Sequence, residues 1–188
     1  MRVRGHLLVG GVAAGIVVAQ LPAQLPPLPR ASIIALCLLG ALAPDLDTMQ
    51  STLGRWCWPV ILLGRWALSN PLTWLAFGRR RVRRVVGHRG FSHSLLACVL
   101  VTLLVTAGIA SAGVGVVAHF GETARYVALG LGRWTLAEWA IAHGAAFFVG
   151  AISHCAADMC TEAGVPFLYP WIERRFGFGP RFLRPRMR

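Results

Sequence analysis

The longest uncharged stretch of the chain is residues 94–118, SLLACVLVTLLVTAGIASAGVGVVA, which contains 25 consecutive residues without an acid or a base. About 20 apolar residues in a helix are enough to cross the hydrocarbon core of a bilayer. This stretch therefore predicts a membrane-spanning helix, which excludes an ordinary water-soluble domain.

Three other apolar segments support the same interpretation. Residues 134–153 form a second predicted span, with Glu138 as its one acid. Segments 7–21 and 31–43 are shorter, and either span with the help of flanking residues or pack as shallower helices. With 56% hydrophobic and 14% charged residues, the chain is predicted to be an all-α, polytopic membrane helix bundle of about four membrane helices. Residues 1–173 would form one domain.

The N-terminal twenty residues also fit a second interpretation. A basic start, an apolar middle and small residues are typical of a secretory signal peptide. Cleavage of such a peptide would remove His6.

The basic residues, all of them arginine, predict the orientation of the bundle. With a cytoplasmic N-terminus, four helices leave segments 1–5, 44–91 and 159–188 inside, and these segments hold 16 of the 19 arginines. Because short cytoplasmic loops are enriched in basic residues, both termini are expected in the cytoplasm, on the inner face of the cytoplasmic (inner) membrane.

Two basic regions predict contact with lipid. The insert 53–84 combines four tryptophans with the run RRRVRR at 79–84, which is typical of an interfacial loop, and the tail 174–188 is also basic. Anionic lipids are the expected partners of both regions. A nucleic-acid role is disfavoured, since no aromatic interleaving or recognition motif accompanies the arginines.

Histidines and aspartates converge on the same predicted membrane face. Carboxylates at membrane depth are costly unless they are paired or bound to a cation, so their grouping with histidines predicts a metal site. Each of these residues begins or ends a predicted helix: His6, Asp45, Asp47, His88, His93, His154 and Asp158.

Local spacing supports some of these ligands more than others. His154 and Asp158 are four residues apart, which places both on one helix face. Ser92 is the expected N-cap of the third helix, which would mount His93 on its first turn and leave His88 in a turn that folds back. Mixed nitrogen and oxygen ligands suit zinc, manganese or iron, with zinc expected first. His119 and His143 are interpreted as structural.

Three ordered motifs carry a resemblance to a known family. They are GALAPDLD at 40–47, HRGFSHS at 88–94, and the pattern G-x-x-S-H-x-x-x-D that opens the stretch 150–165. Together with the N-terminal histidine, they resemble the YdjM-like family of bacterial and archaeal inner-membrane, metal-dependent hydrolases. That family is distantly similar to zinc-dependent phospholipase C and the S1/P1-type nucleases.

The resemblance implies a hydrolase acting on a phosphoester or lipid-linked substrate at the cytoplasmic membrane face. It implies metal ligands at His6, Asp45, Asp47, His93, His154 and Asp158, with His88 beside them. Asp47 and His88 are expected in catalysis as well, and Arg89 is placed either to hold an anionic group or to serve as a topology charge. The alternatives are a metal-binding membrane protein that transports ions, or a regulatory protein that contacts DNA.

Overall fold

The computed structural model describes residues 3–22, 27–47, 55, 90–121, 134–161, 163–172 and 174–178. Within these ranges the chain is helical, and the only strand-like pairing is an isolated antiparallel bridge between Val165 and Phe176. The predicted all-α class is confirmed. The insert 53–84, apart from Arg55, and the basic tail beyond residue 178 lie outside the described residues.

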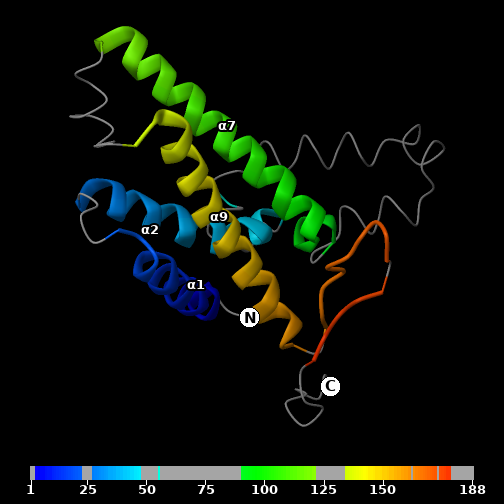
Figure 1. The fold of residues 1–188 in the computed structure, drawn as a ribbon. Helices are drawn as coiled ribbons and strands as arrows, with labels where there is room; N and C mark the ends of the chain where they lie inside the picture. Colours follow the sequence, from blue (N-terminus) through cyan, green and yellow to red (C-terminus); the bar gives the residue numbers. More distant parts are fainter. Residues whose placement is uncertain are drawn as a thin grey trace, which may run out of the picture.

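Four α-helices and two short 3-10 helices make up the described fold. The α-helices are α1 (Val3–Ala19), α2 (Pro27–Leu42), α7 (Leu95–Phe120) and α9 (Leu136–Met159). The 3-10 helices are η1 (Ala43–Asp47), directly after α2, and η2 (Phe91–His93), directly before α7. In Figure 1, α9 lies between α7 and the pair formed by α1 and α2, and it packs against all three.

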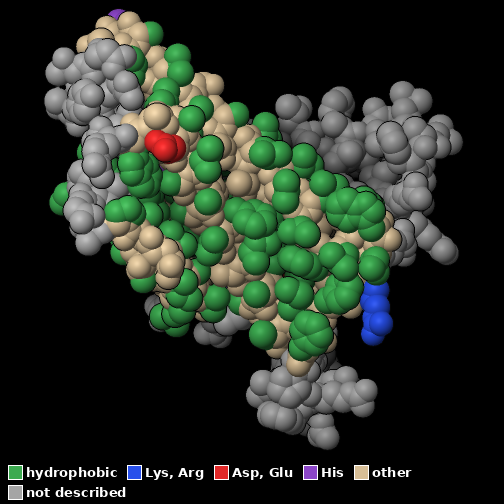
Figure 2. All heavy atoms as spheres, in the orientation of Figure 1, with side chains coloured by type: hydrophobic (Ala, Val, Ile, Leu, Met, Phe, Trp, Pro, Cys, Tyr) green, Lys and Arg blue, Asp and Glu red, His purple; other side chains and the backbone are tan. Residues whose placement is uncertain are grey.

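Three stretches of helix are long and apolar enough to cross a membrane: Pro27–Leu46, Leu95–Phe120 and Leu136–Met159. Helix α1 is shorter, with an apolar segment at Gly5–Ala19. Segment 31–43, predicted as short, is therefore part of a full-length candidate span. Of the four described α-helices, only α1 falls short of that length. On the face seen in Figure 2, hydrophobic side chains dominate the described surface, as lipid-facing helices require.

The start of each long helix has a local explanation. Thr135 and Glu138 form a capping box at the start of α9, in which each side chain accepts a hydrogen bond from the other residue's backbone N–H. Glu138 thus lies at the end of the helix and not deep within the span. Ser94, and not Ser92 as predicted, is the N-cap of α7, since its hydroxyl accepts a hydrogen bond from the N–H of Ala97.

Close helix contact explains the motif glycines. A Cβ atom at Gly40 would overlap the carbonyl oxygen of Phe147, and one at Gly150 would overlap that of Cys37. Helices α2 and α9 therefore approach each other at two positions that only glycine permits. This approach brings the C-terminal end of α2, with η1, against the last turns of α9.

The segment after α9 folds back over the same end of the bundle. Gly164 has φ +55°, a left-handed conformation that favours glycine, and its neighbour Val165 pairs with Phe176. The carbonyl of Phe167 accepts a hydrogen bond of 2.7 Å from the N–H of Leu95, the first residue of α7. These contacts fix the start of α7 relative to the end of α9.

Candidate metal centre

Five buried or mostly buried side chains from four elements meet at one end of the bundle. His6 comes from the start of α1, Asp45 from η1, His93 from η2, and His154 and Asp158 from the last turns of α9. They form two overlapping groups of potential metal ligands, His6–His154–Asp158 and Asp45–His93–His154. The predicted convergence of these five residues at one end of the molecule is therefore seen in the structure.

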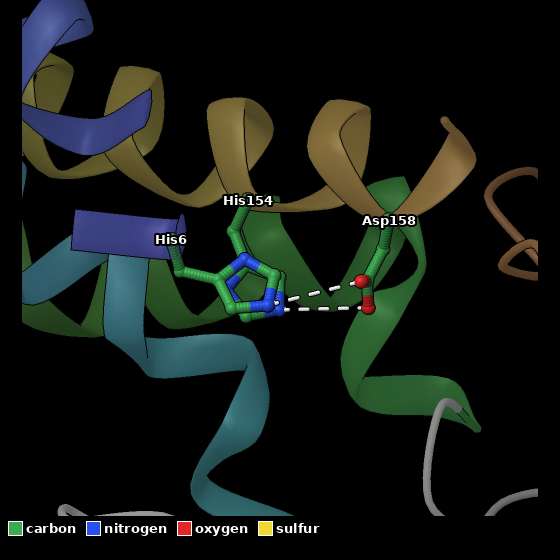
Figure 3. Close-up of side chains that lie close together, drawn as sticks. All are labelled: His6, His154 and Asp158. Carbon is green, nitrogen blue, oxygen red and sulfur yellow. Dashed lines mark ion pairs between the residues drawn. The ribbon is translucent and has the colours of Figure 1, made fainter. Parts of the chain in front are cut away.

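The first group is drawn in Figure 3. The imidazole rings of His6 and His154 stack with centroids 3.8 Å apart and planes inclined by 9°. Both Nε2 atoms point toward the Asp158 carboxylate, at 3.8 Å from Oδ1 for His6 and 3.8 Å from Oδ2 for His154. The i, i+4 spacing of His154 and Asp158 places them on one face of α9, as predicted.

The second group continues from the first through His154. Its Nε2 lies 3.3 Å from Nε2 of His93 and 3.6 Å from Oδ1 of Asp45. Nε2 of His93 is 3.6 Å from the same Asp45 oxygen and 3.5 Å from Oδ2 of Asp158. The five side chains therefore form one continuous cluster, which we call the metal centre.

These separations suit ligands around an ion better than direct hydrogen bonds. An N–H···O hydrogen bond is about 2.7–3.2 Å long, whereas five His–Asp separations in the metal centre are 3.5–3.8 Å. Zinc bonds of about 2.0–2.2 Å in tetrahedral geometry place neighbouring ligand atoms about 3.3–3.6 Å apart. The spacing of the donor atoms therefore fits a divalent cation.

The tautomer of His154 also fits a bound cation. Its Nδ1 lies 2.7 Å from the carbonyl oxygen of Ala41, which can only accept a hydrogen bond, so Nδ1 carries the proton. In the neutral ring Nε2 of His154 then carries a lone pair, 3.3 Å from Nε2 of His93. A buried imidazole nitrogen with a lone pair is a suitable ligand for a cation.

Burial and charge complete the fit. His6, His93, His154 and Asp158 are at most 1% exposed, and Asp45 is 16% exposed. With neutral histidines the two carboxylates carry a formal charge of −2, which a divalent cation would balance in an environment where unpaired charge is costly. Nδ1 of His6 is buried and has no hydrogen-bond partner within the described part of the chain, so it remains available to a cation or a water molecule.

One predicted feature of the centre needs correction, and one stays a prediction. The side chain of Asp47 lies outside the described part of the structure, so its expected role as a ligand and in catalysis stays a prediction. His93 lies in η2 and not on the first turn of α7, because Ser94, two residues after the predicted cap Ser92, is the N-cap of that helix.

Other sequence predictions fall outside the centre. His88 and Arg89 lie outside the described residues. His143 is buried in α9 but is occupied by its own partners, with Nδ1 2.7 Å from the Trp139 carbonyl and Nε2 2.6 Å from the Ser32 hydroxyl. His119 packs against Phe120 at the far end of α7. Neither histidine is in a ligand group of the described residues, and their structural interpretation stays a prediction.

Outer contacts orient the ligands, and sequence reasoning missed them. The carbonyl of Ala41 fixes the ring of His154, and the Ser92 hydroxyl lies 2.9 Å from Nδ1 of His93. Hydrogen bonds of this kind set the tautomer and orientation of metal-binding histidines. The serine directly before His93 was the available signal, since its hydroxyl can reach Nδ1 of the neighbouring ring.

Comparison with known proteins identifies the family. The chain matches the YdjM inner membrane protein family over residues 1–187. It is 30% identical over 173 residues to the inner membrane protein YdjM of Escherichia coli (strain K12) and equally to that of Shigella flexneri. The match covers 90% of this chain and 66% of the length of each relative. No solved structure matches the chain. On this evidence the chain belongs to the YdjM inner membrane protein family.

Proposed function

We propose that the protein is a membrane-bound, metal-dependent hydrolase that cleaves a phosphoester at the cytoplasmic face of the inner membrane. The observation that carries the proposal is the buried grouping of three imidazoles and two carboxylates at one end of an apolar bundle. Such donors suit zinc first, with manganese or iron as alternatives. A divalent cation held there would supply Lewis-acid chemistry, activating water and stabilising charge on a phosphoryl oxygen.

The residues of the chain have separable tasks in this proposal. His93 and His154 present Nε2 to the cation, held in place by Ser92 and by the carbonyl of Ala41. Asp158 is fully buried and balances charge, whereas Asp45 is the most exposed member of the centre. We therefore place the substrate on the side of η1, where Asp45 can accept a proton from the attacking water.

The overall reaction is a hydrolysis. The oxygen of a water molecule forms a bond to phosphorus while the bond from phosphorus to the leaving oxygen breaks. The proton taken up from the water is returned to the leaving oxygen, so Asp45 ends the cycle as it began. Arg89, outside the described residues, remains a proposed contact for the anionic group.

Metal analysis of the purified full chain tests the centre. We expect at least about one zinc or manganese ion per chain. His154→Ala and Asp158→Asn should each lose most of that metal. His143→Ala is the matched control, because His143 is also buried on α9 but bonds only to Ser32 and Trp139 among the described residues. Metal content that is unchanged in His154→Ala and Asp158→Asn would refute the centre.

Catalysis needs its own measurement. The metal-loaded protein should hydrolyse a chromogenic phosphodiester or a phospholipid in mixed micelles, and Asp158→Asn should lose that activity together with its metal. A metal-loaded protein inactive on a broad panel of phosphoesters would favour the metal-binding alternative without hydrolysis.

Ion transport is the less favoured alternative. Away from the metal centre, α1, α2 and α9 enclose an apolar cluster that contains Ala13, Ile33 and Cys37, and the polar Ser32 and His143 side chains there are bonded to each other. A conduction path for ions normally presents a series of polar groups. Zinc uptake into proteoliposomes that is abolished by Ser32→Ala or His143→Ala would reverse this preference.

A further inference from the structure

A cavity of about 310 Å³ lies beside the metal centre, between the 3-10 helices and the first turns of α7. Its walls come from η1, η2, α7 and α9, and all but one of the lining side chains are apolar. The exception is Ser92, whose hydroxyl is already close to Nδ1 of His93. A water molecule needs two to four polar partners to be stable in a cavity, so this cavity favours an apolar occupant.

Some residues that line the cavity are sequence neighbours of two ligands of the metal centre. Pro44 and Leu46 line it, and they flank Asp45 on η1. Phe91 and Ser92 line it as well, and they directly precede His93 on η2. A molecule in the cavity therefore contacts residues that directly flank Asp45, the most exposed member of the centre.

The cavity also borders the surface that faces lipid. Val101 lines it and is 38% exposed on α7. The apolar window of α7 is 11% buried, against 56% for that of α9, so α7 presents most of its surface outward. In a bilayer, the medium on that side of α7 is hydrocarbon. The deep wall of the cavity is formed by the small, buried Ala97, Cys98 and Ala151, which leaves room for a chain to enter.

We propose that this cavity binds one hydrocarbon chain of a membrane phospholipid whose phosphate group lies at the metal centre. The inference rests on the proposed function and narrows its substrate class to acylated phosphoesters. The volume is at the lower end of the range for ligand sites, which fits part of a single chain and not a whole lipid. The rest of the lipid would stay in the bilayer, while its phosphate meets the cation beside Asp45.

Photolabelling of the full chain tests the occupant. The probe is phosphatidylglycerol with a diazirine midway along one acyl chain, offered in nanodiscs, with labelled peptides located by mass spectrometry. We expect labelling of peptides that contain residues 91–101. Val101→Trp, which adds bulk at the cavity wall, should reduce it about tenfold for every two methylene groups that the new side chain excludes. Leu104→Trp is the matched control, because Leu104 is 73% exposed on the same helix and does not line the cavity.

A second variant guards against local misfolding. Ala43→Phe adds bulk from η1, on the opposite wall, and should reduce labelling as Val101→Trp does. Both variants should keep the metal content of the wild type. Labelling that survives both substitutions, or that spreads evenly over the exposed face of α7, would overturn the inference.

Two other results separate the inference from the proposed function. Crosslinks between two protein molecules through residue 101 would show that a second copy of the protein fills the cavity. This result would also overturn the inference. Wild-type protein that labels as expected but binds no metal would refute the metal centre while supporting the hydrocarbon site.

Discussion

At the scale of single residues, the metal centre depends on how each imidazole is oriented. His154 has its tautomer fixed by the carbonyl of Ala41, and His93 has Nδ1 beside the Ser92 hydroxyl. His6 has no comparable partner among the described residues and is held by stacking on His154. The three rings are therefore constrained in three different ways, and the proposed function predicts that a substitution outside the ligand set weakens metal binding.

Asp45 and Asp47 provide a direct test of that geometry. We expect Asp45→Ala to raise the Kd for zinc by at least about tenfold, since even outer contacts of a metal site contribute 10–100-fold. Asp47→Ala, measured beside it, tests the sequence prediction that Asp47 is also a ligand, which predicts a comparable rise in the Kd. An unchanged Kd in Asp45→Ala would remove Asp45 from the ligand set. Titration with a competing zinc chelator gives both values. Equal losses in the two variants would show that η1 presents both carboxylates to the ion.

Ser92 tests the orienting contact to His93. Ser92→Ala removes the hydroxyl 2.9 Å from Nδ1 and should weaken zinc binding by about 10–100-fold. Ser153→Ala is a suitable control, because the hydroxyl of Ser153 donates to the carbonyl of Gly150 within α9 and does not contact a ligand. If the two variants bind zinc equally well, the Ser92 hydroxyl does not position His93.

At the scale of secondary-structure elements, the crossing of α2 and α9 determines where the ligands meet. Gly40 and Gly150 allow the helix backbones to touch, and the contact lies just before Asp45 along α2–η1 and just before His154 along α9. The small residues found at such interfaces let membrane helices approach closely. Residues that look like weak helix formers therefore serve the site by fixing the distance between two helices.

Gly150→Ala should lower thermal stability because its Cβ would overlap the carbonyl of Cys37. Overpacking of this kind costs about 1–3 kcal/mol, and the zinc content should fall as well. Gly108→Ala, on α7, is the control, since nothing lies within 4 Å of the added methyl group; it should be neutral or stabilising by up to about 1 kcal/mol. Thermal unfolding in detergent, followed by circular dichroism, measures both. A Gly150→Ala protein as stable as Gly108→Ala would show that the helices separate without cost.

At the scale of the whole molecule, the ligands lie at one end of an apolar bundle that three candidate spans anchor in the membrane. This arrangement suits a reaction at the membrane surface more than passage through it. The distribution of arginines predicts that this end faces the cytoplasm.

Thiol labelling tests that orientation. Cys160 is exposed near the metal centre, whereas Cys37, Cys98 and Cys155 are buried. The test uses a Cys57→Ser background, because Cys57 lies outside the described residues. An impermeant maleimide applied to spheroplasts should label the Gly121→Cys variant, at the far end of α7. It should label Cys160 only after the membrane is permeabilised. The reverse pattern would place the metal centre outside the cytoplasm.

Local patterns along the chain predict the class of fold and the candidate members of the site. Runs of uncharged residues predict membrane helices because the bilayer tolerates few unpaired charges, and the same cost makes the buried histidines and aspartates conspicuous. The family motifs gave the order of the ligands along the chain. Each of these signals is local, so it is visible without coordinates.

Which of the candidate residues come together depends on the tertiary structure. The start of α7 at Leu95, after the Ser94 cap, places His93 in η2. The orienting carbonyl of Ala41 belongs to a different helix from His154, so no spacing along the chain could reveal it. The apolar cavity is likewise formed by residues from three distant parts of the chain, 43–46, 91–101 and 147–151. These features depend on directions and distances between helices, which are set by packing and not by periodicity.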